Sequence, residues 1–140
     1  MAEKINWNFV AQVLKGPSIS GADSLEVDAY EKFDFTIAKD GTNTVALQDA
    51  SKISLLIISS ATYPKISLQH PQPKIIYKGG TGTTAKKLPG EPDSGYVLDA
   101  PHIFIGQIAK DFFKDSTDIT FTNSTGAEVE IQILIGRTIA

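Results

Sequence analysis

Apolar and polar residues alternate along short stretches of this chain, with the period of two that is typical of strands buried on one face. The alternation is clearest in residues 25–30, 33–38, 44–47, 119–122 and 129–135. Glycine, proline, asparagine, aspartate and serine cluster between these stretches, and such residues favour turns. Short strands separated by turns indicate an all-β fold. We therefore predict an antiparallel β-sandwich or jelly roll of about 8–10 short strands.

The first segment, residues 5–14, fits the pattern of a strand and also that of a helix. Apolar residues recur at every second position, which favours a strand. A helix would also gather apolar residues on one face, ahead of the helix stop Gly16-Pro17. Two asparagines disfavour a helix interior, and the alternation is the longer match. We predict a strand, followed by a turn-rich connection over residues 16–24.

Three turn sequences predict hairpins between strands that are neighbours in the chain. An Asp-Gly pair between apolar runs is a strong hairpin signal, and prolines belong in turns because they cannot donate to a strand ladder. The turns are Asp40-Gly41 between residues 33–38 and 44–47, His70 to Pro73 between 65–69 and 74–78, and Asn123 to Ala127 between 119–122 and 129–135.

Four further stretches complete the predicted single domain of residues 1–140. The almost wholly apolar residues 53–58 predict a central strand covered on both faces. Short strands are expected at 96–98 and 103–105, and apolar residues at helical spacing predict a short helix near 106–114. Residues 79–95, with five Gly and two Pro, form a long connection of the kind that is functional, lies in an interface or is disordered.

Composition supports a sheet-rich chain and removes several chemistries. The 140 residues include 35 that are β-branched, which pack well on pleated surfaces. With no cysteine, the chain has no thiol nucleophile, disulfide or thiolate metal site. A net charge of −3 is far from a nucleic-acid footprint. Its basic residues are twelve lysines and one arginine, which argues against bidentate phosphate recognition.

The sequence also predicts a protein that is neither secreted nor bound to a membrane. Its longest unbroken apolar run, Leu55 to Ile58, is far short of the ~20 residues that a spanning helix needs. The first residues lack the basic and apolar regions of a secretion signal. Ala2 stands where N-myristoylation requires glycine. We expect the chain to stay in the cell that makes it or in a particle assembled there.

The glycine-rich residues 79–87 invite comparison with a phosphate-binding loop. In that motif a glycine precedes the lysine and a serine or threonine follows it. Here Ala85 precedes Lys86 and Lys87 follows it. No helix is predicted after the loop to point its amides at a phosphate. We therefore predict no nucleotide cofactor and interpret the loop as one that contacts a partner or moves.

The two histidines are the remaining catalytic candidates. His70 and His102 each lie beside a proline, and Asp99 lies three residues before His102. A serine or threonine could complete a triad, but no Gly-x-Ser-x-Gly elbow exposes one. Such arrangements arise by chance in a chain with 11 Ser and 12 Thr. We predict structural or surface histidines and no enzyme.

Metal and sugar sites have weaker signals. Four carboxylates could converge on a calcium ion between loops: Asp23, Asp40, Glu91 and Asp93. No metal-binding spacing such as HExxH accompanies them, and we predict no metal. The four tyrosines and Trp7 could stack on sugars, although aromatic residues of strands more often pack in a core or an interface. Asn123-Ser124-Thr125 is a glycosylation sequon that is explained more simply as a turn.

One pattern points beyond a fold class. A strand pair with an Asp-Gly turn over residues 33–47 precedes the apolar strand 51–60, and Val97-Leu98-Asp99 later precedes the closing pair 119–136. This order resembles that of small β-sandwich structural proteins of tailed bacteriophage particles, such as decoration or head and tail accessory subunits. The resemblance covers most of 33–60 and 96–136, and the 79–95 loop has no counterpart in it. It implies a symmetric assembly without catalytic residues.

We accordingly expect a homo-oligomeric virion protein that binds itself and the major capsid or tail proteins, and binds neither nucleic acid nor membranes. It would be assembled in the host cytoplasm. The N-terminal strand or the long loop could pair with a neighbour. The candidate interface residues are Trp7, Phe9, Lys86, Lys87 and Leu88. The alternative is a binding module, either a carbohydrate-binding sandwich or a calcium-dependent C2-like domain.

Overall fold

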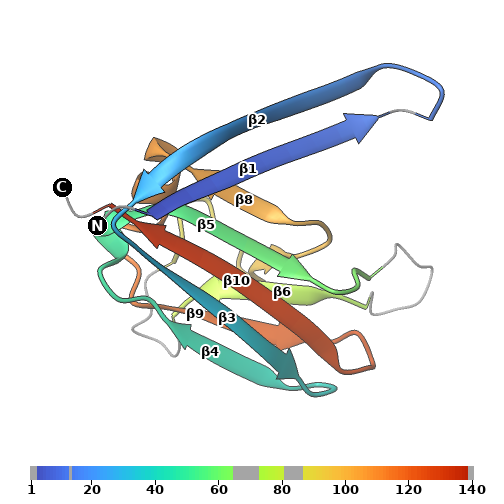
Figure 1. Cartoon of the computed structure of the whole chain (residues 1–140). Helices are drawn as coiled ribbons and strands as arrows, with labels where there is room; N and C mark the ends of the chain where they lie inside the picture. Colours follow the sequence, from blue (N-terminus) through green and yellow to red (C-terminus); the bar gives the residue numbers. More distant parts are fainter. Residues whose placement is uncertain (1–2, 13, 65–72, 81–86, 139–140) are drawn as a thin grey trace.

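Ten strands, one α-helix and one 3-10 helix make up the computed structural model, which describes residues 3–12, 14–64, 73–80 and 87–138 (Figure 1). Eight of these strands form two four-stranded antiparallel sheets, and the first two form a separate hairpin. The predicted all-β sandwich with one short helix is therefore confirmed.

The two sheets have the connectivity of a jelly roll. The first sheet contains, in spatial order, β3 (Ala29–Ile37), β10 (Val129–Arg137), β5 (Ile53–Ser60) and β8 (His102–Ile105). The second sheet contains β4 (Thr42–Ala46), β9 (Asp118–Asn123), β6 (Ile75–Gly79) and β7 (Tyr96–Val97). Among the described strands from β3 onward, every connection except β6 to β7 passes from one sheet to the other. Two Greek keys wound in this way define the jelly roll.

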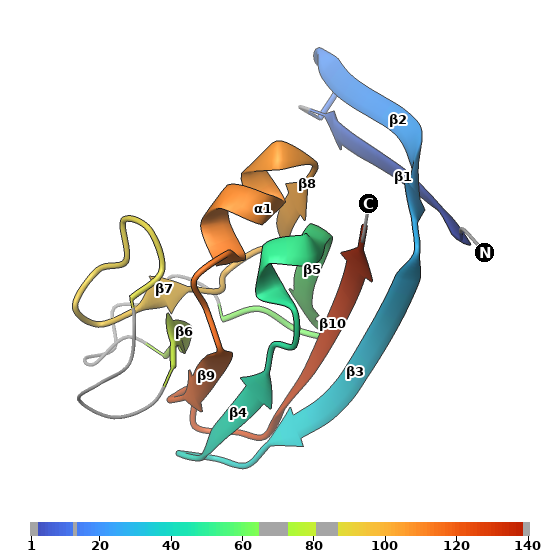
Figure 2. The same cartoon turned by 90° about the vertical axis from the view of Figure 1, so that its left-hand side faces the viewer.

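Side chains from the facing sides of the two sheets form the core, and Figure 2 shows the two layers from the side. On β10, buried Ile131, Ile133 and Ile135 alternate with side chains that point out of the sandwich. Buried Phe121 of β9 and Tyr77 of β6 belong to the same cluster. The central position predicted for residues 53–58 is confirmed, because β5 lies between β10 and β8.

The helix α1 (Gln107–Phe113) and the short 3-10 helix η1 (Ala50–Lys52) contact each other at one end of the sandwich (Figure 2). Phe113 and Ala109 of α1 are buried, whereas Ile108 is 60% exposed. Gly106 adopts a φ of 80° just before α1, a conformation that glycine tolerates without strain. This turn takes the chain directly from β8 into the predicted helix.

Two of the three predicted hairpins are wrong in their pairing. Asp40-Gly41 does form a tight turn, in which the Gly41 amide donates to the Ala38 carbonyl at 2.8 Å. However, β3 pairs with β10 and β4 pairs with β9, so the turn joins the two sheets. Residues 123–127 likewise join β9 of the second sheet to β10 of the first. Alternation shows which face of a strand is buried, but not which strand lies beside it.

The third predicted hairpin, with strand 65–69 and turn 70–73, lies almost wholly outside the described residues. Its second strand is present as β6. β6 pairs with β9 on one side and with β7 on the other, so it is a central strand of the second sheet.

The strand predicted over residues 5–14 is confirmed as β1 (Glu3–Gln12), but the turn-rich connection over 16–24 is wrong. Residues from Ser18 onward form β2 (Ser18–Val27), which pairs with β1 along its whole length, from Gln12 opposite Ser18 to Glu3 opposite Val27. Serine, glycine and alanine dominate the start of β2 and mask it as a turn. Backbone pairing needs no apolar alternation where one face of the ribbon is left open.

We call the β1–β2 hairpin the arm, because it extends away from the sandwich, which we call the body (Figure 1). Its base packs on Gly136 of β10, where an added Cβ would lie 2.9 Å from Val27 Cγ1 and 3.2 Å from Ile5 Cδ1. Only glycine leaves room for these two side chains against the backbone of β10. Val27 is 1% exposed as a result, so the arm is anchored at its base.

Candidate interaction surface between arm and body

The arm has an apolar and a polar face. Residues directly opposite each other in an antiparallel pair share a face. The inner face, toward the first sheet, carries the pairs Ile5–Leu25, Trp7–Asp23, Phe9–Gly21 and Ala11–Ile19. The outer face carries Lys4–Glu26, Asn6–Ser24, Asn8–Ala22, Val10–Ser20 and Gln12–Ser18. The inner face is thus an apolar stripe along the arm, interrupted by Asp23.

Two aromatic rings lie in the middle of this stripe. Trp7 and Phe9 stack with their ring centroids 6.4 Å apart and their planes 10° from parallel. A Cβ at Gly21 would lie 2.8 Å from Phe9 Cε1, so the Phe9 ring covers the bare backbone of β2. Phe9 is still 44% exposed, because nothing in the described part of the chain covers its other side.

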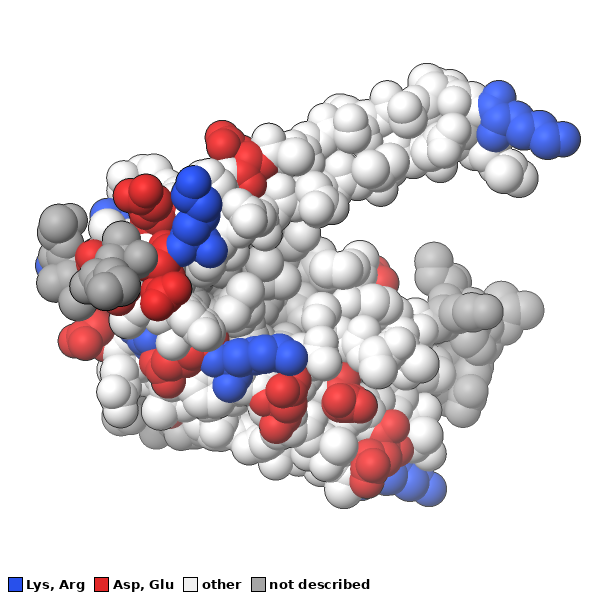
Figure 3. Space-filling model, viewed as in Figure 1, with Lys and Arg blue, Asp and Glu red and all other residues white. Residues whose placement is uncertain are grey.

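An apolar cleft of about 860 Å³ separates the arm from the outer surface of the first sheet. We call it the arm cleft, and it is visible as the hollow below the arm in Figure 3. Its lining residues are Asn6, Trp7, Asn8 and Phe9 from the arm, and Ile57, Ile103, Ile105 and Ile108 from the body. None of these eight is charged. Ile103 is 50% exposed, and exposed apolar patches of this kind mark sites of interaction.

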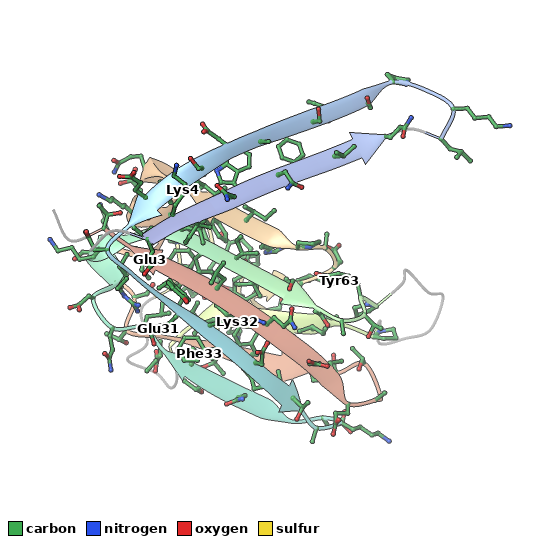
Figure 4. All side chains as sticks on the ribbon, viewed as in Figure 1. Glu3, Lys4, Glu31, Lys32, Phe33 and Tyr63 are labelled. Carbon is green, nitrogen blue, oxygen red and sulfur yellow. The ribbon has the colours of Figure 1, made fainter. Side chains whose placement is uncertain are left out.

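Most charged residues of the arm lie near its base, and Asp23 lies midway along it, opposite Trp7. Glu3 and Lys4 lie at its base (Figure 4), with Asp23 and Glu26 on the returning strand. Between residues 5 and 22 the only charged residue is Lys15, near the tip. A segment so poor in charge lacks the usual protection of an exposed β-ribbon against pairing with other chains.

Of the five predicted interface residues, Trp7 and Phe9 line the arm cleft, and Lys86 lies outside the described residues. Lys87 is exposed, and its Nζ donates to Asp93 Oδ1 at 2.8 Å. This hydrogen bond raises the pKa of Lys87 and lowers that of Asp93. Lys87 lies in the connection between β6 and β7 of the second sheet, and it does not line the arm cleft.

Leu88 is not a surface residue, which corrects its place among the interface candidates. It is 2% exposed and belongs to the buried core. Glu91 Oε1 accepts hydrogen bonds from the amides of Gly79 at 2.7 Å and Leu88 at 3.3 Å. These bonds fold the end of the 79–95 loop back onto β6. Polarity of the flanking residues had concealed this inward turn.

The isoleucines on the body side of the arm cleft were missed as candidates. Ile57 and Ile103 are paired across β5 and β8, with their side chains on the outer face of the first sheet. A sheet face that is open to water normally carries polar residues. The almost unbroken apolar run of β5 from Ile53 to Ile58, interrupted only by Ser54, was the available signal. It predicted coverage on both faces, and the arm covers only part of the outer one.

His102 makes a structural hydrogen bond. The hydroxyl of Tyr77 and Nδ1 of His102 share a hydrogen bond at 2.5 Å, in which the tautomer of His102 decides which atom donates. Burial lowers the pKa of His102, partly offset by Asp99, and burial raises the pKa of Tyr77. His70, the other half of the candidate pair, lies outside the described residues.

The burial of His102 predicts a pH-dependent stability. The pKa of His102 is lower in the folded than in the unfolded chain, so the unfolded state takes up a proton first as the pH falls. We expect the free energy of unfolding to fall between about pH 7 and pH 5. Urea denaturation across this range should show it in a His70→Gln background, where His102 is the only imidazole. The double variant His70→Gln, His102→Gln should lose the slope; a slope that remained would assign it to other groups.

The four carboxylates considered for calcium are not brought together. Asp23 lies on the arm, Asp40 in the turn between the sheets, and Glu91 and Asp93 in the loop before β7. Within the described ranges, no group of three or more His, Asp or Glu side chains is placed to hold a metal ion. Asn123 of the sequon is fully buried and serves the turn.

The single arginine is also structural. Arg137 is 7% exposed, its Nε donates to the Gln48 carbonyl at 2.8 Å, and its guanidinium pairs with Glu31 of β3. It therefore ties β10 to the neighbouring edge of the sandwich. In the described part of the chain, no helix is both long and apolar enough to cross a membrane.

The arm and the arm cleft thus form the surface on which exposed apolar side chains gather. No protein-family model, curated protein or solved structure matches this chain.

Proposed function

We propose that this chain is a non-enzymatic structural protein of a phage or phage-like particle, which self-associates and binds the capsid or tail proteins around it. The observation that supports the proposal best is the arm, whose apolar stripe is anchored at its base and exposed toward its tip. An isolated two-stranded ribbon is marginally stable in water, so a partner is expected to cover it.

The fold supports the same proposal by analogy only. Jelly rolls occur in viral capsid proteins, and also in lectins and cupins, so the fold alone does not select a function. The virion location, assembled in the host cytoplasm, rests on the resemblance in the order of strands and turns. The edge strands of both sheets and the arm would supply the contacts with neighbouring proteins.

The oligomeric state tests the proposal. Sedimentation and native mass measurements on the purified chain should give multiples of the 15.1 kDa monomer that grow with protein concentration. The mass should respond weakly to salt, because apolar surface rather than charge drives the association. A monodisperse monomer at the highest soluble concentration would overturn the self-association on which the proposal rests.

A carbohydrate-binding module is the second candidate. One observation favours it: Trp7 and Phe9 form an aromatic platform in the arm cleft. Aromatic faces can stack on sugar rings. Binding on a glycan array that is lost in Trp7→Ala would favour this function over the structural one. The calcium-dependent variant has no such support.

A further inference from the structure

The outer half of the arm carries apolar side chains on its inner face and one large apolar side chain, Val10, on its otherwise polar outer face. We call residues 8–12 and 18–22 the distal arm. Phe9, Ala11 and Ile19 lie on its inner face, and Val10 lies on its outer face with 71% of its surface exposed. Leu14 at the tip is 90% exposed. The exposed apolar surface of the arm is therefore greatest in this half and at the tip.

The apolar stripe of the arm continues a surface that is already buried at its base. Val27 is 1% exposed, and Ile5 and Leu25 are half-buried against the body. Farther out, Phe9 is 44% and Ile19 65% exposed. The inner face of the arm is therefore apolar apart from Asp23, and the chain's own fold covers only its first part.

The arm cleft offers walls of matching chemistry. Its body side is made by the isoleucines of β5, β8 and α1, and its arm side by Trp7 and Phe9. No residue of this lining is charged, so a charged group placed in the cleft would lose its hydration without gaining a partner. The distal arm is likewise without charged residues. An uncharged, thin and apolar segment is the occupant that the cleft fits, and the distal arm is such a segment.

The area is also sufficient for a stable contact. Five residues of a strand span about 17 Å and two paired strands about 10 Å, so each face of the distal arm offers about 170 Å². With both faces and the matching walls covered, each arm in a cleft buries about 700 Å², and a reciprocal exchange about 1,400 Å², in the range of stable interfaces.

We propose that the distal arm of one copy of this chain lies in the arm cleft of a second copy, between that copy's arm and the outer face of its first sheet. The proposal rests on the self-association proposed above and specifies how it occurs. Each copy both gives an arm and receives one. Val10 of the inserted arm then contacts the isoleucines of the body wall. Phe9, on the opposite face of the inserted arm, contacts the aromatic rings of the receiving arm.

Cysteine cross-linking tests the contact directly, because the chain has no cysteine of its own. A tagged Val10→Cys chain is mixed with an untagged Ile103→Cys chain and treated with a short thiol cross-linker. We expect a tagged–untagged dimer, identified by mass. The matched pair Val10→Cys with Val97→Cys should give little cross-linked dimer. Val97 is similarly exposed, at 42%, but it lies on the second sheet. Cross-linking only within a chain that carries both Val10→Cys and Ile103→Cys would overturn the exchange.

A charge in the cleft wall provides the second measurement. Ile103→Glu places a carboxylate where the arm should dock, at a side chain exposed enough to leave folding intact. We expect the dissociation constant of the oligomer to rise about tenfold or more, as burial of an unpaired charge requires. Val97→Glu is the matched control and should leave it unchanged, and circular dichroism should show both variants folded.

The outcomes separate this inference from the proposed function. An oligomer that persists unchanged in Ile103→Glu, without the Val10–Ile103 cross-link, leaves self-association standing and overturns the arm exchange. A monomeric natural chain overturns both. A cleft that retains a glycan, or a different protein of the particle, while copies of the chain do not cross-link, also overturns the exchange.

Discussion

Asn123→Asp is expected to lower the free energy of unfolding by about 3–5 kcal/mol, although it changes a single atom type. Asn123 is fully buried, and its Nδ2 donates to the carbonyls of Ile37 at 3.1 Å, Ala38 at 3.2 Å and Ala127 at 2.7 Å. Its Oδ1 accepts from the Thr125 amide at 3.0 Å. Aspartate keeps the acceptor but turns a negative charge toward three carbonyl oxygens. Urea denaturation at pH 7 measures the loss.

Two comparisons sharpen this prediction. Ser124→Ala in the same turn removes an exposed hydrogen bond to the Lys74 carbonyl and should cost about 1 kcal/mol or less. The introduced carboxyl has a raised pKa in the folded state, so folding favours its protonated form and the loss should shrink as the pH is lowered toward 4. A stability of Asn123→Asp within about 1 kcal/mol of the natural chain at pH 7 would contradict the role of this side chain.

Phe121→Ala is expected to cost about 3–5 kcal/mol through a cavity between the two sheets. Phe121 is fully buried on β9 and packs edge-on against Phe35 of the first sheet, with ring centroids 5.7 Å apart. It also contacts the ring of Tyr77, with centroids 5.8 Å apart. The side chain therefore joins both layers, and no neighbour can fill its place without moving a strand. Thermal and urea denaturation measure the loss.

Val97→Ala serves as the control for cavity formation. Val97 lies on a strand of the same sheet but is 42% exposed, so its truncation should cost well under 1 kcal/mol. Phe121→Leu, which keeps most of the buried volume, should fall between the two. Equal losses for Phe121→Ala and Val97→Ala would mean that the two sheets are not held together at Phe121.

The sequence predicted the buried faces of the strands well, because alternation depends only on which side of a strand faces the core. Ile131, Ile133 and Ile135 lie inside the sandwich as expected, and residues 53–58 form a central strand. The pairing of strands was not predictable in the same way. The Asp40-Gly41 turn fits a hairpin and a step between sheets equally well, because both need a tight reversal.

The candidate surface was only half predictable. Trp7 and Phe9 stood out as aromatic residues on a strand, and they do line the cleft. The opposite strand β2 was hidden, because its small polar residues serve backbone pairing and make room for the Phe9 ring at Gly21. Asn123 was recognised as part of a turn, but its three bonds to carbonyls of distant strands depend on the way the sheets are stacked.

The place of β10 in the chain governs how the body is made. β10 pairs with both β3 and β5, joining Ala29 to Arg137 and Ile133 to Ile58, yet it is the last described strand to be synthesised. Until it leaves the ribosome, the first sheet lacks the strand at its centre. Sheets built from such distant pairs fold slowly, in milliseconds to seconds. A pause in translation before residue 129 therefore leaves the isoleucines of β5 open to aggregation.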